Sequence, residues 1–276
     1  MAAAAVGWGT WALFLRGHGV HPSWQSLLIL SVIALAWLPA ALRHSLRSLA
    51  RAPWAWALLL AASLTEAGNY LCYFGALDRG PIALAVLTHY LAPVVVAALA
   101  PLLLNEALTG RTAMALAVSL LGLGLLMGEG ALSQASSRTA TLGALSAVFY
   151  ALNTLTTKKA LEHFAASELL AYHCIAAVVM VAPFAGAPPA PAAFLWLPLL
   201  GAVLVGACGG ALYYVGLRRI PAQRAAILAY LEPLVASLVG YFAFAEPLSP
   251  VGLLGGALIV AGGAAAATAS PAARAR

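Results

Sequence analysis

Ten apolar stretches, separated only by short gaps rich in charged residues, Pro or Gly, run along almost the whole chain. A helix needs about 20 mostly apolar residues to cross the hydrocarbon core of a bilayer. The chain is 63% hydrophobic and only 8% charged, whereas soluble chains are about 45–50% apolar and about 25% charged. The sequence therefore predicts an all-α membrane protein with ten transmembrane helices and no soluble domain. The predicted spans are 2–15, 24–42, 54–77, 82–104, 112–128, 141–157, 167–185, 194–216, 225–245 and 250–269.

The first predicted span is short for a full crossing. We expect either that it continues past Arg16 or that the natural chain begins upstream. A signal peptide is not expected, because residues 1–15 lack a basic N-terminal region and further apolar stretches follow.

Basic residues in the gaps predict the orientation, since Lys and Arg accumulate on the cytoplasmic side of a membrane. With the N-terminus inside, eleven basic residues fall on the cytoplasmic side and three on the other. We therefore expect both termini in the cytoplasm and the protein in the cytoplasmic (inner) membrane. The net charge of +6 is explained by this topology, so no nucleic-acid partner is expected. The eleven are Arg43, Arg47, Arg51, Arg111, Lys158, Lys159, Arg218, Arg219, Arg224, Arg274 and Arg276, against Arg16, Arg79 and Arg138.

An internal repeat relates the two halves of the chain. A shift of 140 residues aligns 54–124 with the second half without a gap. Each half would hold five spans, so the second half enters the membrane in the opposite sense, which is an architecture typical of secondary transporters. We predict two inverted five-helix repeats, 1–130 and 141–270, and a short basic tail, 271–276. The matched pairs include Trp56 with Trp196, Tyr73 with Tyr213, Arg79 with Arg219, Pro81 with Pro221, Tyr90 with Tyr230, Pro93 with Pro233, Glu106 with Glu246 and Gly122 with Gly262.

Short motifs carry a family resemblance. These are the Trp8-Gly9 pair in the first span, Tyr-Leu-x-Pro at 90–93 and 230–233, and the Glu closing each of those two spans. In these motifs and in its five-plus-five plan the chain resembles the drug/metabolite transporter superfamily, EamA-type branch. The resemblance implies a central substrate cavity surrounded by spans one to four and six to nine, with spans five and ten at the periphery. That family includes exporters of amino acids and other metabolites.

Polar residues inside the apolar spans are the candidates for a substrate site, since a charge in the bilayer costs at least about 2.5–3.5 kcal/mol unless it faces protein or water. Glu66, Asn69, Tyr70 and Tyr73 share one helix face by their spacing. Such a stripe indicates a cavity wall, or else a hydrogen-bond cluster that only joins helices. His89 and His173 are each equally well a core residue or a ligand. We assign Glu106 and Glu246, at span ends, to capping or interhelical contacts. The candidate substrate-binding residues are Trp8, Trp11, Glu66, Asn69, Tyr70, Tyr73, His89, Tyr90, Tyr150, Asn153, Tyr230 and Glu232.

These patterns favour a secondary transporter, with an exporter as the expected direction, that carries small metabolites such as amino acids or amines by alternating access. Glu66 and Glu232 are the candidates for proton coupling. A structural or lipid-handling membrane protein without a solute site is the alternative. No enzyme is expected, because the sequence lacks hydrolase and metal-site motifs and its only Asp is Asp78. No cofactor or metal is expected, and a monomer and a homodimer both remain open.

Overall fold

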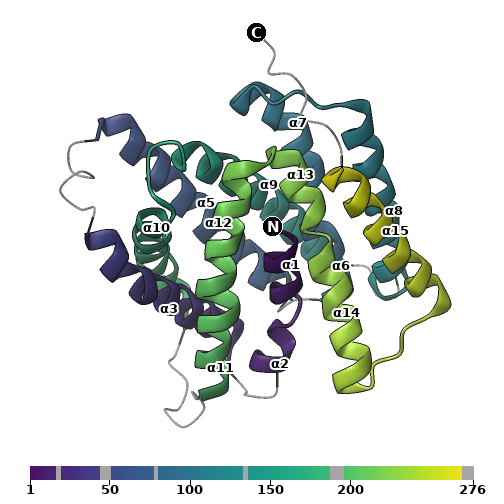
Figure 1. Cartoon of the computed structure of the whole chain (residues 1–276). Helices are drawn as coiled ribbons and strands as arrows, with labels where there is room; N and C mark the ends of the chain where they lie inside the picture. The colour runs from purple at the N-terminus through teal and green to yellow at the C-terminus, as the bar shows by residue number, and fades with distance from the viewer. Residues whose placement is uncertain (17–19, 44–50, 78–79, 133–135, 187–195, 269–276) are drawn as a thin grey trace.

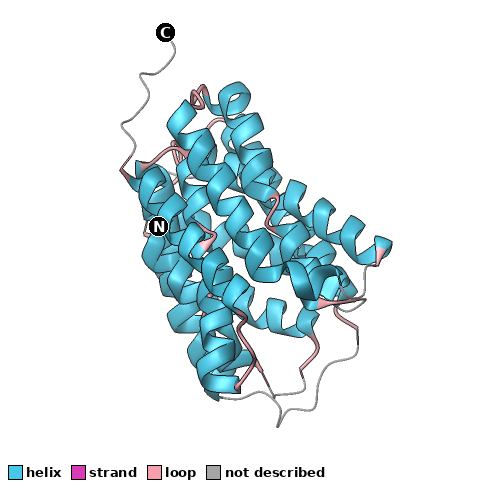
Figure 2. Ribbon diagram, turned by 90° about the vertical axis from the view of Figure 1, so that its right-hand side faces the viewer, coloured by secondary structure: helices cyan, strands magenta, loops and turns pink. Residues whose placement is uncertain are grey.

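The computed structural model describes residues 1–16, 20–43, 51–77, 80–132, 136–186 and 196–268. Arg47, Asp78, Arg79 and the tail 271–276 lie outside the described residues. All regular structure in the described part is helical (Figures 1 and 2). The elements are α1 (Ala2–Trp8), α2 (Trp11–Leu15), α3 (Pro22–Leu42), α5 (Pro53–Leu77), α6 (Ile82–His89), α7 (Ala92–Leu104), α8 (Gly110–Leu132), α9 (Ser137–Ala160), α10 (Ala166–Val181), η1 (Ala182–Phe184), α11 (Trp196–Gly201), η3 (Ala202–Cys208), α12 (Gly209–Arg219), α13 (Ala222–Leu228), α14 (Leu231–Phe244) and α15 (Pro250–Ala267).

The length and composition of these helices identify an all-α membrane protein. Seven helical segments of the described chain are long and apolar enough to cross a membrane, and Ala2–Leu15 is a shorter apolar segment. The helical bounds agree with the ten predicted ranges to within four residues. The long helices α5 and α9 are not among the seven, because polar side chains interrupt their apolar sequence. These two helices pack extensively against each other inside the bundle, where a partly polar helix meets protein rather than lipid.

Several segments are broken within their length. Helix α6 gives way to α7 at Tyr90 and Leu91, and α13 gives way to α14 at Ala229 and Tyr230. Each break comes just before a Pro, which lacks the backbone N–H of a regular helix. Both α7 and α14 then end on a residue in the left-handed conformation, Asn105 (φ 54°) and Ala245 (φ 53°). These two residues are related by the same 140-residue offset as the sequence repeat.

Helices α8 and α15 form a close pair on the right of Figure 1. Small residues allow this approach, as is common between helices in lipid. A Cβ added at Gly122 would lie 2.5 Å from the backbone oxygen of Gly255. A Cβ at Gly262, the repeat partner of Gly122, would lie 2.8 Å from the backbone oxygen of Ala115. Each of these two equivalent glycines therefore allows its own helix to approach the other, Gly122 from α8 and Gly262 from α15.

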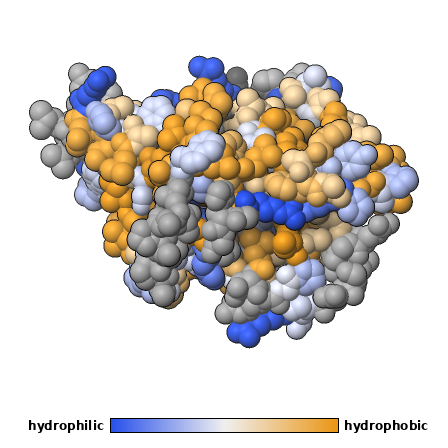
Figure 3. Space-filling model, turned by 90° about the horizontal axis from the view of Figure 1, so that it is seen from below, coloured by the Kyte–Doolittle hydropathy of each residue, from blue (hydrophilic) through white to orange (hydrophobic). Residues whose placement is uncertain are grey.

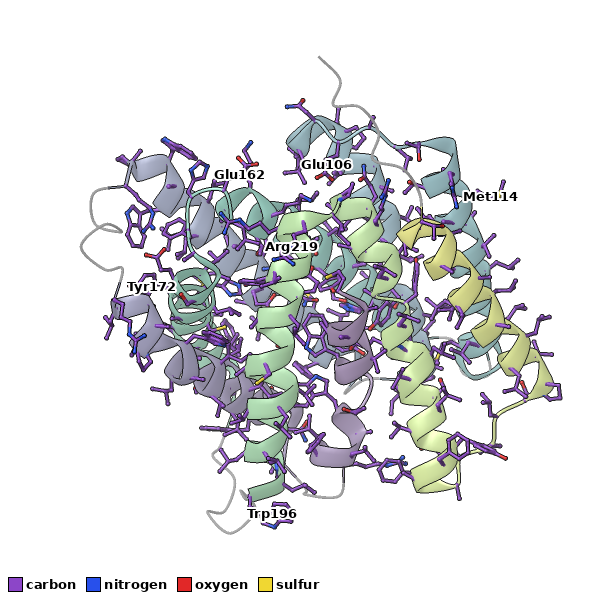
Figure 4. All side chains as sticks on the ribbon, in the orientation of Figure 1. Glu106, Met114, Glu162, Tyr172, Trp196 and Arg219 are labelled. Carbon is purple, nitrogen blue, oxygen red and sulfur yellow. The ribbon has the colours of Figure 1, made fainter. Side chains whose placement is uncertain are left out.

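The outer surface is largely apolar, and charged groups gather at the ends of the helices. Seen from below, hydrophobic residues cover much of the drawn surface, with hydrophilic patches between them (Figure 3). Met114 is 66% exposed and points away from the bundle (Figure 4). Glu106, Glu162 and Arg219 lie toward the upper end in the same view, and Trp196 at the lower end. This division is the one expected of a protein that is wet at both ends and covered by lipid between them.

Gly122→Val should lower stability through overpacking, by about 1–3 kcal/mol, because its side chain meets backbone atoms of α15. Gly124→Val is the matched control, since nothing lies within 4 Å of a Cβ added there. The thermal unfolding midpoint in detergent measures the difference. Equal midpoints for the two variants would contradict the close packing of α8 on α15.

Candidate functional site

A cavity of about 360 Å³ lies within the bundle. Its walls come from α1, α2, α3, α5, α6, α9, α10, η3, α12 and α14. Helices α8 and α15 contribute none of the described lining residues, which agrees with the expectation that spans five and ten are peripheral. The volume is within the range of small-molecule pockets, about 300–1,000 Å³. The cavity can therefore hold one small solute.

Ten of the twelve predicted site residues line this cavity. They come from both halves of the sequence, although no single stretch of the chain holds more than four of them. The ten are Trp8, Trp11, Glu66, Asn69, Tyr70, Tyr73, His89, Tyr150, Asn153 and Glu232.

The other two predicted residues, Tyr90 and Tyr230, are not among the lining residues. Both side chains are buried, and the Tyr230 hydroxyl donates to the backbone oxygen of Tyr90 at 3.0 Å. Their rings lie 6.1 Å apart. The pair joins the break between α6 and α7 to the break between α13 and α14, so it holds two repeat-related positions together beside the cavity.

The predicted stripe on α5 forms one wall. Glu66, Asn69, Tyr70 and Tyr73 all face the cavity, and Phe74 extends the same surface. The Oδ1 atom of Asn69 is buried and has no hydrogen-bond partner among the described residues. Since a buried polar atom without a partner costs about 1–3 kcal/mol, this acceptor is suited to a donor brought by a ligand.

Polar residues of α9 both line the cavity and join helices. Tyr150 and Asn153 line the cavity. The Asn153 amide also donates to the backbone oxygen of Ala62 in α5 at 2.9 Å. The next residue, Thr154, is hydrogen bonded to the Tyr213 hydroxyl at 3.1 Å. These polar groups therefore hold α5, α9 and α12 together while they form the wall.

Two imidazoles complete the polar lining. The Nδ1 atom of His89 lies 2.9 Å from the Ser146 hydroxyl, and its ring centre lies 4.3 Å from that of Tyr73. His173 of α10 lies 3.5 Å from the Asn153 amide and 3.4 Å from the Tyr214 hydroxyl. Both imidazoles are buried and joined to neutral groups, so each serves as structure and as cavity wall.

Several lining residues were not among the predicted ones. Tyr213 could have been found, because it is the repeat partner of Tyr73. For His173 the sequence leaves a ligand and a core residue equally open. The remaining ones carry no sequence signal, because their place in the wall depends on how the helices pack. They are Gln25, Phe74, Cys174 and Tyr214, beside smaller and apolar residues.

The contacts of Trp8 and Gly9 explain why these two residue types stand at the end of α1. The Trp8 ring lies 5.0 Å from that of Tyr213, and its indole N–H donates to the backbone oxygen of Val205 at 3.1 Å. Val205 lies in η3, a π-helical segment. A Cβ added at Gly9 would lie 2.5 Å from Cβ of Val235 and 2.7 Å from the backbone oxygen of Glu232. Glycine thus lets α1 approach α14 closely while Trp8 reaches the cavity.

Glu106 joins three helices at the upper end of the bundle (Figure 4). One of its carboxylate oxygens lies 2.8 Å from Nζ of Lys158, and the other accepts from the backbone N–H of Ala222 at 2.6 Å. Lys158 also donates to the backbone oxygens of Leu217 and Ile220. Gln223 donates to the backbone oxygen of Glu106 at 2.8 Å. The ends of α7, α9 and α12 are therefore tied to the start of α13.

Glu246, the repeat partner of Glu106, makes the matching contact at the other end. It pairs with Arg16 at 2.5 Å, and both side chains are about half exposed (51% and 49%). In the Lys158–Glu106 pair the side chains are only 14% and 18% exposed. The prediction that Glu106 and Glu246 make capping or interhelical contacts is confirmed. Glu168 likewise caps α10 and pairs with Arg51 at 2.7 Å, away from the cavity.

Among the described residues, no group of three or more His, Cys, Asp or Glu side chains is arranged to hold a metal ion. The lining groups can form hydrogen bonds, ring contacts and ion pairs. The arrangement is suited to binding a solute reversibly.

Comparisons with known proteins agree with this picture. The model of the EamA-like transporter family matches residues 1–128 and 137–267. An uncharacterized transporter of Archaeoglobus fulgidus is 31% identical over 94% of this chain and 92% of its own length. A crystal structure of a protein, 22% identical, superposes with a TM-score of 0.79 over 97% of this chain and 96% of that one. At that identity the likeness shows the fold alone.

Asn153→Ala should destabilise the protein by about 1–3 kcal/mol, because it leaves the buried oxygen of Ala62 without its donor. The matched control on the same helix is Thr141→Ala, whose exposed hydroxyl bonds only to Ser137 of its own helix. Thermal unfolding in detergent compares them. A midpoint for Asn153→Ala no lower than that of the control would contradict a structural role for this amide.

Proposed function

The chain belongs to the EamA-like transporter family and is a membrane transporter; on this premise we propose that it is a secondary transporter of small metabolites such as amino acids or amines. It would act as an exporter, by alternating access around the cavity described above. The observation that carries the proposal is the cavity itself, whose polar and aromatic lining comes from both halves of the chain.

The proposal includes a ten-helix inverted repeat, 1–130 and 141–270. The two segments matched by the family model support it. So do three structural features that recur 140 residues apart: helix breaks at Tyr90 and Tyr230, left-handed residues at Asn105 and Ala245, and end contacts of Glu106 and Glu246. Two similar halves in opposite orientation can exchange conformations, and that exchange would turn an inward-open cavity outward.

The contacts at the two ends support an outward-facing conformation. The cavity extends along α2 to Leu15 and to Gln25 near the start of α3, toward the end where Arg16 meets Glu246. At the opposite end Lys158, Glu106 and Gln223 form a largely buried network that joins α7, α9, α12 and α13. With both termini in the cytoplasm, as the basic residues predict, the joined end is the cytoplasmic one.

The Lys158–Glu106 network would then be the cytoplasmic closure, and the Arg16–Glu246 pair its counterpart outside. A basic depression of about 870 Å³ adjoins the closed end, lined in part by Lys159, Arg218 and Arg219. In the inward-facing state this depression would be the vestibule through which cargo enters from the cytoplasm. Exchange between the states would break one ion pair and bury the other.

Glu66 and Glu232 are the proposed sites of proton coupling, because they are the only carboxylates among the described lining residues. We expect Glu66→Gln and Glu232→Gln to abolish the response of transport to a pH gradient, since an amide cannot take up the exchanged proton. The measurement is uptake and efflux in proteoliposomes, for a solute first found by thermal stabilisation of the purified protein. Glu162→Gln, at an exposed carboxylate that is not among the cavity-lining residues, is the control.

Unchanged, gradient-dependent transport in both glutamine variants would remove the carboxylates from the mechanism. Folded protein that is stabilised by no member of a panel of amino acids, amines and other metabolites, and moves none of them, would contradict the transport function as a whole.

We expect Glu106→Gln and Lys158→Met to favour the inward-open state, because each removes one partner from the largely buried Lys158–Glu106 ion pair. The readout is modification of Cys174, which lines the cavity, by a membrane-impermeant thiol reagent applied from the cytoplasmic side of inverted vesicles. Cys72 and Cys208 are replaced by Ser in all samples. A shift of about 1.4 kcal/mol gives a tenfold faster modification.

Arg111→Met is the matched control, since Arg111 does not line this depression and its exposed side chain donates only to the Thr268 hydroxyl among the described residues. It should change the rate little. Equal rates for all three variants would show that the Lys158–Glu106 pair does not hold this end closed.

A further inference from the structure

The charges of the cavity wall are all of one sign. Glu66 of α5 and Glu232 of α14 are its carboxylates, and none of the described lining residues is Lys or Arg. Both carboxylates line the same cavity as Tyr150 and Tyr213, so the two acids face a common space. Within the described residues, the side-chain hydrogen bonds of the buried imidazoles go to the neutral groups Ser146, Asn153, Tyr214 and Cys174. The described lining therefore offers two carboxyl groups without a built-in counter-charge.

Basic residues at the two ends of the bundle are committed to other carboxylates. Arg16 is paired with Glu246, Lys158 with Glu106, and Arg51 with Glu168. In low-dielectric surroundings a carboxylate needs a counter-charge or a proton. Since no Lys or Arg lies among the described lining residues either, a ligand or a proton would supply that charge to Glu66 and Glu232.

The hydrogen-bond donors of the wall are largely in use. The indole of Trp8 donates to the backbone oxygen of Val205, the amide of Gln25 to that of Val20, and the amide of Asn153 to that of Ala62. The acceptor Oδ1 of Asn69 has no partner among the described residues. The tyrosine hydroxyls can donate or accept a hydrogen bond, so they do not discriminate between ligands rich in donors and ligands rich in acceptors. A ligand rich in donors fits this set better than one that brings another acceptor.

Aromatic rings dominate the remaining surface. Trp8, Trp11, Tyr70, Tyr73 and Phe74 line one side, with Tyr150, Tyr213 and Tyr214 from the second half. Ring faces attract cations, with a gain of about 0.5–2 kcal/mol for each well-placed ring. They also accept an apolar group of the ligand.

Resting on the transport function proposed above, we infer that the cargo is an organic cation: a protonated amine with an aromatic or aliphatic group and no carboxylate. Its ammonium group lies between Glu66 and Glu232 and donates to Asn69, while its apolar group lies against the rings. A monocation neutralises one carboxylate, and a proton on the other leaves the occupied cavity neutral. This narrows the proposed range of metabolites, because an amino acid would bring its own carboxylate into a wall that already holds two.

Three probes that share a phenyl ring distinguish a cationic from a zwitterionic or an anionic cargo in the purified full chain. They are 2-phenylethylamine (a cation), phenylalanine (a zwitterion) and phenylacetate (an anion), each titrated by calorimetry. We expect the dissociation constant of the amine to be at least tenfold lower than that of phenylalanine, and phenylacetate not to bind at the same concentrations. If phenylalanine binds as tightly as the amine, or if none of the three probes binds, the inference is overturned. This result needs only the unaltered protein.

Glu66→Gln and Glu232→Gln test the assigned contacts. Each should weaken binding of the amine at least tenfold, while the control Glu162→Gln should bind it like the unaltered protein. Amine binding that persists unchanged in the double variant overturns the assignment of the carboxylates.

Flux in proteoliposomes separates this inference from the transport function. An amine that binds in a carboxylate-dependent way but is never transported would contradict the transport function and support the inferred binding site. Saturable phenylalanine transport without amine binding would support the transport function and contradict the inferred cargo.

Discussion

The hydrocarbon core of a bilayer contains no water, so every polar group in it must find its partner within the protein. This requirement explains the centre of the bundle. Helices α5 and α9 carry the most conspicuous polar stripes, and they pack against each other rather than against lipid. The Asn153 amide satisfies a backbone oxygen of α5, and Tyr230 satisfies the backbone of the broken helix at Tyr90. Polar residues here both build the cavity and hold it together.

The same requirement governs the helix ends. Asn105 and Ala245 turn the chain in the left-handed conformation, and the Glu that follows each of them reaches a basic residue of another helix. The two ends differ in burial: the ion pair is largely buried at Glu106 and about half exposed at Glu246. Within the proposed mechanism that difference identifies the conformation: similar contacts are made at both ends, and only one end is closed at a time.

Much of this architecture could be predicted from the sequence, because hydrophobic length and the spacing of Glu66, Asn69, Tyr70 and Tyr73 are local properties. The helical bounds agree with the structure, and ten of the twelve candidate residues line the cavity. The role of Tyr90 and Tyr230 could not be predicted, since it depends on two breaks meeting in space. The same holds for the π-helical turn that accepts from Trp8, because no local pattern records which carbonyl a distant indole will reach.

The positions of the two cavity carboxylates link binding to motion in the proposed mechanism. Glu66 belongs to the first half and Glu232 to the second, so a cation between them bridges the two bodies that must rock. When the halves move, the separation of the acids changes, and with it the free energy of holding one charge between them. A ligand shifts a two-state equilibrium only by its differential affinity for the two states. A cation shared by Glu66 and Glu232 would supply this differential affinity at the centre of the bundle. The ion pairs of Glu106 and Glu246 would bias the same conformational equilibrium at its two ends.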